Sequence, residues 1–238
     1  MARLNQHISQ QFDKELEDVR SKVLAMGGLV EDHLQKVIDT FAHGDFEAAE
    51  YVAVNDFQVN ALEVEIDSDC TEILLRRQPA AGDLRLVMAI TKTITDLERI
   101  GDEAEKIARL VLKLRGDGLG GYYVGMIAMG HHVRRMIHNA LDSFARMDAE
   151  MAFEVAQEDS EVDIETDAIM RQMITYMMED PRSISRVLDA VLAVRAIERI
   201  GDHARNICEN VIYQVKGKDV RHLALNQVEQ ELRLSSKR

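Results

Sequence analysis

Two pairs of carboxylates stand four residues apart in this chain, and their spacing is suited to metal binding. Glu98 and Asp102 form the first pair. Glu198 and Asp202 repeat it later in the chain. On a helix this spacing places both side chains on one face, about 5–6 Å apart at Cβ, where like charges repel. A hard cation such as Mg²⁺, Ca²⁺, Mn²⁺ or iron accepts carboxylate oxygens and would reverse that repulsion. We therefore predict a candidate metal site at each pair.

A second set of oxygen ligands precedes each pair. Its members are Asp56 and Asn60 in the first half, and Asp159 and Asp163 in the second. Pro79 and Pro181 lie between the two sets in each half, where a helical hairpin would turn. Counted outward from the proline, the acids of both arms lie at the same height along the hairpin. The spacing is consistent with a carboxylate cluster, although it does not fix which way the faces point.

The same acids also have an interpretation as a solvated helix surface. Asp102 would then pair with Lys106, and Glu105 with Arg109, in surface ion pairs of small energetic value. Spacing alone leaves both interpretations open. Of the eight His, His203 beside Asp202 is a minor ligand candidate in the second half only.

The chain is internally duplicated, which makes an accidental pattern less plausible. Residues 98–107 read ERIGDEAEKI and residues 198–207 read ERIGDHARNI, with seven of ten positions identical. The arginine in each copy, Arg99 and Arg199, either forms a structural ion pair, which we favour, or holds an anion. Two aspartates typical of helix starts, Asp45 and Asp148, precede the two prolines at matching distances. We infer two copies of one unit.

Each copy predicts three helices, because apolar residues recur at three- and four-residue steps between turn signals. The predicted helices span about 5–43, 45–78 and 83–115 in the first unit, and 122–147, 148–180 and 182–216 in the second. The glycine-rich segment 116–121 marks the boundary between units. The prediction is an all-α protein of two tandem, pseudo-two-fold-related three-helix bundles with six long antiparallel helices. The predicted domains are 1–116 and 117–217, followed by a short polar helix or tail at 218–238.

Composition narrows the classes of partner and compartment. The formal net charge of −13 disfavours binding to nucleic acid or anionic lipid. We find neither a signal peptide nor a run of about 20 apolar residues, and so expect no direct membrane insertion. Cys70 and Cys208 form no CxxC motif and are expected to be reduced and buried. These features together predict a cytoplasmic protein.

The duplicated motif and its surroundings resemble the PhoU family of bacterial phosphate-signalling regulators. The resemblance extends over nearly the whole chain. It rests on the segments at 60–67, 76–107, 171–184, 195–209 and 213–222. It implies paired three-helix bundles, usually dimeric, without catalytic activity. It also implies an adaptor between the Pst phosphate transporter, through its ATPase subunit, and the sensor histidine kinase PhoR, which keeps the phosphate-starvation (Pho) regulon off when phosphate is plentiful.

The resemblance also implies iron or zinc clusters held by Glu/Asp-x-x-x-Asp motifs. Carried over to this chain, the motif positions are Glu98, Asp102, Glu198, Asp202, Asp159 and Asp163. In the first unit the second-helix motif departs from the pattern, with Asn60 beside Asp56. An amide oxygen coordinates without charge, so we expect the first unit to hold cations more weakly, or to hold Mg²⁺ or Ca²⁺ in place of iron.

Two other functions are weighed against the non-enzymatic adaptor. One is a carboxylate-bridged metal enzyme on a helical bundle, which the absence of any Glu-x-x-His motif disfavours. The other is a metal-free helical scaffold whose acid pairs hold basic partner surfaces.

Overall fold

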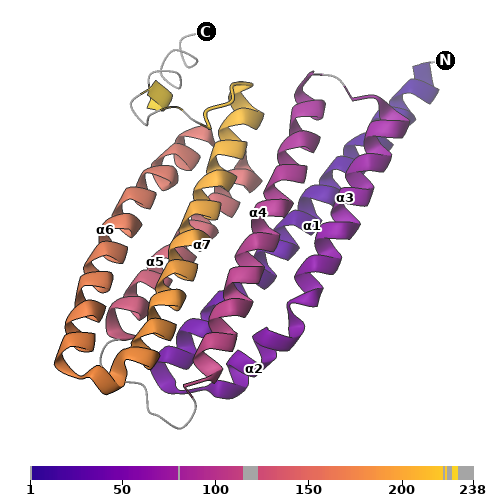
Figure 1. Cartoon of the computed structure of the whole chain (residues 1–238). Helices are drawn as coiled ribbons and strands as arrows, with labels where there is room; N and C mark the ends of the chain where they lie inside the picture. The colour runs from indigo at the N-terminus through magenta and orange to yellow at the C-terminus, as the bar shows by residue number, and fades with distance from the viewer. Residues whose placement is uncertain (1, 80, 115–122, 222, 224–226, 230–238) are drawn as a thin grey trace.

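The computed structural model describes residues 2–79, 81–114, 123–221, 223 and 227–229, and these form helices and turns without a strand. The α-helices are α1 (Ala2–His43), α2 (Phe46–Asn55), α3 (Phe57–Arg77), α4 (Ala81–Leu112), α5 (Val124–Arg146), α6 (Ala149–Glu179) and α7 (Ile184–Lys216). A short 3-10 helix, η2 (Pro181–Ser183), precedes α7. The predicted all-α fold is confirmed (Figure 1).

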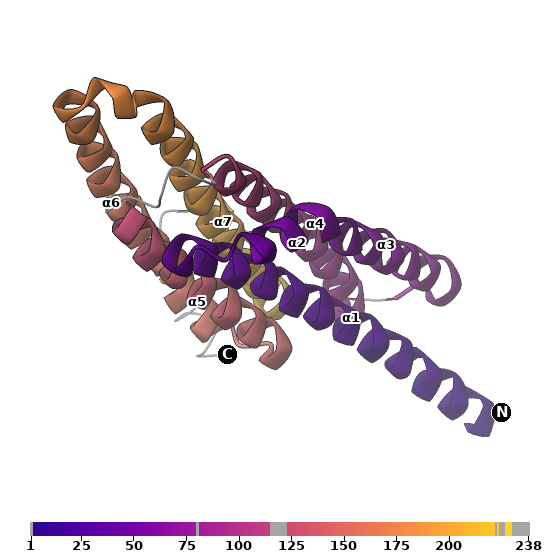
Figure 2. The same cartoon turned by 90° about the horizontal axis from the view of Figure 1, so that it is seen from below.

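The helices form two three-helix bundles that repeat one plan, with the pair α2–α3 counted as one bent helix. In the first unit, α1 and α4 pack with the bent pair α2–α3, and in the second α5, α6 and α7 pack together. The units meet where α4 lies against α7 and α1 lies against α5 (Figure 2). α4 and α7 are antiparallel, because Lys113 contacts Asp189 at one end while Arg85 reaches the Gln214 carbonyl at the other. This arrangement places the two ERIGD segments side by side.

The predicted helix boundaries agree closely with the structure. Asp45 caps α2 by accepting the Ala48 N–H, and Asp148 caps α6 by accepting two backbone N–H groups. Gly44 and Gly217 adopt positive φ after α1 and α7, a conformation that glycine takes without strain. The predicted glycine-rich boundary at 116–121 lies outside the described residues, as does most of the predicted tail. The domain limits therefore stay a prediction.

The predicted second helix of the first unit is wrong in one respect: it is broken. α2 ends at Asn55, and α3 begins at Phe57, with Asp56 in a turn between them. Asn and Asp side chains compete with helical backbone hydrogen bonds, and the Asn55 amide indeed donates to the Tyr51 carbonyl. The matching helix α6 runs unbroken through Asp159. The break sets Asp56 apart from its repeat equivalent.

The crossing of α1 and α5 interlocks two glycines with two branched side chains. A Cβ on Gly27 would lie 2.5 Å from Leu141 Cδ1, and one on Gly130 would lie 2.8 Å from Ile38 Cγ1. Gly27 and Gly130 are repeat equivalents, as are Ile38 and Leu141, so each contact is the pseudo-symmetric copy of the other. Both glycines are needed because side chains replace the missing Cβ atoms at the unit interface.

The buried core is aliphatic and continuous between the units. Cys70 and Cys208 are buried free thiols, as predicted. In the described part of the chain, every helix is too short or too polar to cross a membrane.

Candidate metal centre

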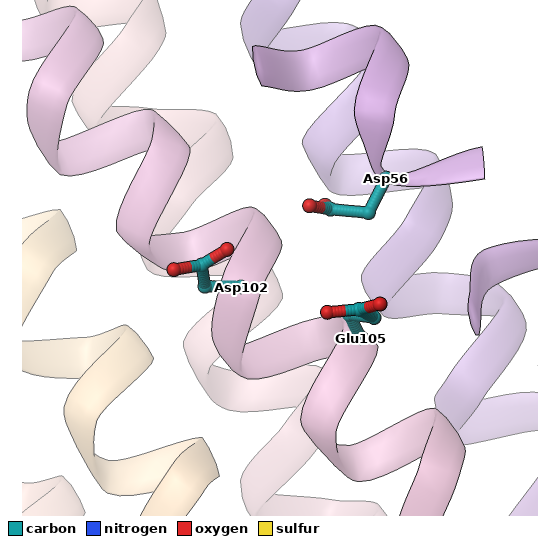
Figure 3. Close-up of side chains that lie close together, drawn as sticks. All are labelled: Asp56, Asp102 and Glu105. Carbon is teal, nitrogen blue, oxygen red and sulfur yellow. The ribbon is translucent and has the colours of Figure 1, made fainter. Parts of the chain in front are cut away.

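Three carboxylates from the first unit converge beside the break between α2 and α3. Asp56, Asp102 and Glu105 each offer an oxygen, and these oxygens lie within 4.8 Å of one another (Figure 3). Asp102 and Glu105 come from adjacent turns of α4, and Asp56 faces them from the break. Within the described residues this is the one group of three His, Cys or acidic side chains that meets this distance.

Asp56 lies deepest in the cluster and lacks a full set of partners. It is 5% exposed. Its Oδ1 is buried and has no hydrogen-bond partner among the described residues, while Oδ2 accepts a hydrogen bond from Asn60 Nδ2 at 3.4 Å. A Cβ at Gly101 would lie 2.8 Å from Asp56 Oδ1, so the glycine makes room for this carboxylate. A buried oxygen that lacks a donor is costly unless a cation or water satisfies it.

The electrostatics of the cluster fit a cation. Burial, followed by the charges of Glu105 and Asp102, raises the pKa of Asp56 to about 6. Partial desolvation and then Glu105 likewise raise the pKa of Asp102. A divalent ion would favour the ionised form of both groups and remove their repulsion. The donor set is all oxygen, which suits Mg²⁺, Mn²⁺, Ca²⁺ or iron better than soft metals.

The other predicted residues of the first unit lie around this cluster with different roles. Desolvation, then Asp102 and Glu63, raise the pKa of Glu98, which places Glu98 in the same field outside the group of three. Asn60 turns its amide toward Asp56 and serves as a donor to that carboxylate. The predicted surface pairs are half right: Arg109 contacts Glu105, but Lys106 pairs with Glu103 in place of Asp102.

The second unit brings its predicted acids together around a built-in cation. Burial, followed by the charges of Asp159 and Glu198, raises the pKa of Asp202. The same causes, in the same order, raise the pKa of Asp163. Asp159, however, accepts a hydrogen bond from Arg205 Nη1 at 3.0 Å. The guanidinium therefore supplies at Asp159 the positive charge that Asp56 lacks.

One difference between the two sites lies at a repeat position that sequence reasoning missed. Glu105 corresponds to Arg205 at an offset of 100 residues. Glu105 was interpreted only as a partner of Arg109, yet its place three residues after Asp102 puts it on the same helix face. That spacing, together with the acid-to-arginine exchange between copies, is the signal that would have found it.

Two further predictions concern residues at the α4–α7 contact. Arg199 forms the predicted structural ion pair, with Glu103 Oε1 at 2.9 Å. His203 turns away from the acid motif, since its Nδ1 lies 3.0 Å from Asp96 Oδ1 on α4. In this structure His203 belongs to the contact between the units.

Comparison with known proteins identifies the repeated unit. The PhoU domain matches residues 23–111 and again residues 126–211. The chain belongs to the PhoU family. It is 52% identical over 231 residues to the phosphate-specific transport system accessory protein PhoU homolog of Pseudomonas aeruginosa, covering 96% of this chain and 95% of the relative. It is 47% identical to phosphate-specific transport system accessory protein PhoU of Escherichia coli K12, covering 96% and 95%.

Two solved PhoU structures share the fold. The crystal structure of PhoU from Pseudomonas aeruginosa aligns with a TM-score of 0.84 at 51% identity, covering 87% of this chain and all of that one. The phosphate transport system regulatory protein PhoU from Streptococcus pneumoniae aligns with a TM-score of 0.81 at 31% identity, covering 88% and 99%. The two tandem bundles seen here are thus the PhoU architecture.

Within that PhoU architecture, the two acidic sites differ in chemistry. The first presents three converging carboxylates and an unsatisfied buried oxygen. The second is neutralised in part by Arg205 and by the contact of Arg195 with Glu198 at 2.8 Å. The geometry therefore favours cation binding in the first unit, whereas the Asn60 substitution suggested weaker binding there.

Proposed function

We propose that this protein is a non-enzymatic regulator of phosphate uptake and signalling, and a negative regulator of the phosphate-starvation regulon. The observation that carries the proposal is the near full-length likeness to accessory and regulatory proteins of the phosphate-specific transport system. In this role it acts in the cytoplasm as an adaptor between the transporter's ATPase subunit and a PhoR-type sensor kinase, as a homodimer.

The state of the two cysteines fits a role without catalysis. Cys70 and Cys208 are both buried. Burial raises the pKa of the Cys70 thiol to about 11 and that of Cys208 higher still. Since the thiolate is the reactive form of cysteine, neither residue is suited to nucleophilic attack at neutral pH.

The same proposal includes a metal ion in the first unit. Asp56, Asp102 and Glu105 would hold it, and Glu98 would add negative charge nearby. Such an ion would fix α4 to the break between α2 and α3, because its ligands come from both. The support is the unpartnered Oδ1 of Asp56 together with the raised pKa values of Asp56 and Asp102.

The experiment measures alkaline phosphatase, as a reporter of the phosphate-starvation response, in cells that lack this protein and grow in phosphate-rich medium. The cells receive the intact chain, a variant with Asp56→Asn, Asp102→Asn and Glu105→Gln, or the control Glu154→Gln, at an exposed acid of α6 outside both acidic sites. We expect the intact chain and the control to silence the reporter and the triple variant to leave it high.

Each other outcome has a distinct meaning. If the intact chain fails to silence the reporter, the regulatory proposal is wrong. If the triple variant silences it fully, regulation stands and the metal is not part of it. Affinity capture of the kinase and the ATPase subunit on the intact chain tests the adaptor role separately, and capture of neither, in high or low phosphate, would contradict it.

A further inference from the structure

A polar groove lies between α4 and α7, away from the carboxylate cluster. Its volume is about 570 Å³. It is lined by Thr91, Lys92, Thr95, Asp96 and Arg99 from α4, and by Arg205, Asn206, Glu209, Asn210 and Arg221 from α7 and the residues after it. Volumes of this order are usual for small-molecule sites. The two repeated helices α4 and α7 line this groove together.

The groove wall is positive in a protein with a net charge of −13. Its lining carries four cations and two carboxylates. Arg205 is paired with Asp159 and Glu209, and Arg221 is paired with Asp219. For Arg99 and Lys92, in contrast, the described residues offer no carboxylate oxygen within 4 Å. Lys92 lies 4.8 Å above the ring of Tyr213.

The repeat explains why Arg99 has no carboxylate partner. Its equivalent Arg199 is held by Glu103 across the α4–α7 contact. The repeat equivalent of Glu103 is His203, so the pseudo-symmetric pair of Arg99 would be an imidazole. His203 is committed instead to Asp96. Among the described residues, Arg99 therefore lacks the direct ion pair that its repeat equivalent makes, although the charge of Glu98 lies near it.

The carboxylate at the floor of the groove, Asp96, already has hydrogen-bond donors from the protein. Asp96 is 7% exposed and accepts hydrogen bonds from His203 Nδ1, Asn206 Nδ2 and Asn210 Nδ2 at 3.0, 3.1 and 3.3 Å. Because both amides are held through nitrogen, their carbonyl oxygens remain as acceptors. The hydroxyls of Thr91 and Thr95 also donate to helix carbonyls, of Val87 and Thr91, which leaves their oxygens to accept.

The two cations that lack a direct ion pair stand apart along α4, with acceptors between them. Lys92 and Arg99 are seven residues apart, which is about 10 Å along a helix. A ligand that satisfies this wall has an anionic group at each end and hydroxyl donors in its middle. Arginine and lysine both bind phosphoryl oxygens well, arginine with a geometry that matches two oxygens at once.

We propose that this groove binds a sugar bisphosphate. One phosphoryl group lies on Arg99 and the other on Lys92, while the sugar hydroxyls donate to Thr95, Asn206 and Asn210. Another groove, lined in part by Lys22, Asp69 and Arg76, serves as a contrast. Its cations are already paired, Lys22 with Glu65 and Asp69, and Arg76 with Glu72. It offers no free charge to an anion. The inference does not depend on the proposed regulatory function.

The test is isothermal titration calorimetry of the full chain with fructose 1,6-bisphosphate, adenosine 3′,5′-bisphosphate, ribose 5-phosphate and inorganic phosphate. We expect at least one bisphosphate to bind at least tenfold more tightly than ribose 5-phosphate or inorganic phosphate, which carry a single phosphate group. Its affinity should fall as the salt concentration rises. Arg99→Gln and Lys92→Gln should each reduce that bisphosphate to the affinity of ribose 5-phosphate. Arg199→Gln, the repeat-equivalent control, should bind like the parent.

Several results would overturn the proposal. These are no binding of either bisphosphate at millimolar concentration, inorganic phosphate binding as tightly as the bisphosphates, or equal losses in Arg99→Gln and Arg199→Gln. Arg99→Lys guards against a folding artefact, since it keeps the charge and should retain part of the affinity. Circular dichroism and urea unfolding of each variant confirm that the helices are intact.

Discussion

Replacing Asp56 by Asn should stabilise the metal-free protein and weaken its response to metal. The pKa of Asp56 is raised from 3.8 to about 6, which means that ionising it costs more in the folded chain than in the unfolded chain. Raising the pKa of this carboxyl from 3.8 to about 6 lowers the free energy of unfolding at neutral pH by at most about 3 kcal/mol. Asn keeps the shape and the contact with Asn60 without the charge. We expect the free energy of unfolding to rise by about 1–3 kcal/mol.

The pH dependence has a defined sign. The folded pKa is the higher one, so the folded state binds the extra proton between about pH 3.8 and 6, and the penalty is absent below that window. The advantage of Asp56→Asn over the parent should therefore be full above pH 6 and shrink as the pH falls toward 4. Urea unfolding of chelator-treated protein, followed by far-ultraviolet circular dichroism, measures both.

Adding metal should offset the advantage of Asp56→Asn over the parent. An ion that binds only the folded parent adds about 2.7 kcal/mol at a hundredfold excess over Kd, and the variant should gain much less. Mn²⁺ and Mg²⁺ are the ions to test. A variant that is less stable than the parent without metal, or that gains as much from metal, would refute the reasoning about this cluster.

The matched control is Asp159→Asn in the second unit. Asp159 accepts from Arg205 at 3.0 Å, so its charge is compensated where that of Asp56 is not. Removing it leaves Arg205 with Glu209 alone. We expect this variant to lose about 1–3 kcal/mol and to respond to metal as the parent does. Opposite signs from two repeat-related substitutions would be hard to attribute to a general effect on helix stability.

Other predictions follow from the same comparisons. Gly101→Ala should destabilise the protein by about 1–3 kcal/mol in urea, because its Cβ meets Asp56 Oδ1 at 2.8 Å. Gly201→Ala, with its nearest atom 3.4 Å away, should be neutral or gain up to about 1 kcal/mol. Arg205→Glu should raise the metal stoichiometry measured by calorimetry from one to two per chain; an unchanged stoichiometry would count against the role of Glu105. Burial lowers the pKa of His33, whose ring nitrogens have no hydrogen-bond partner, so stability should fall as the pH drops below 6.5. His33→Leu should flatten that dependence in acid unfolding.

The fold could be predicted from the sequence because several independent signals repeat in register. The prolines Pro79 and Pro181 and the caps Asp45 and Asp148 each fix one boundary in both units, and the repeated ERIGD motif aligns the two copies. Capping and helix termination are local, so they survive without knowledge of tertiary contacts. The break at Asp56 was missed although a local signal was present, since Asn55 precedes Asp56 where Glu158 precedes Asp159. Burial does not separate the two positions, because Asp56 is 5% and Asp159 8% exposed.

The site was predicted in part for a similar reason. Spacing places Asp102 on the correct helix, and matched heights bring Asp56 opposite it. Spacing does not give the rotation of α4 about its axis, and that rotation selects Glu105 over Glu98 as the third member of the group. The exchange of Glu105 for Arg205 between the copies marks this position more clearly than the spacing of Glu105 from Arg109.

Two exchanges between the copies give the pseudo-symmetric fold an asymmetric distribution of charge. Glu105 in the first unit corresponds to Arg205 in the second, and Glu103 corresponds to His203. The first exchange leaves a carboxylate cluster short of positive charge on one unit, since Arg205 neutralises only Asp159. The second leaves Arg99, within the described residues, without the direct ion pair that Arg199 makes with Glu103. Because a perfectly repeated chain would pair these groups alike in both copies, the divergent positions are where a cation and an anion have room to bind. They are therefore the substitutions to exchange first when testing either proposal.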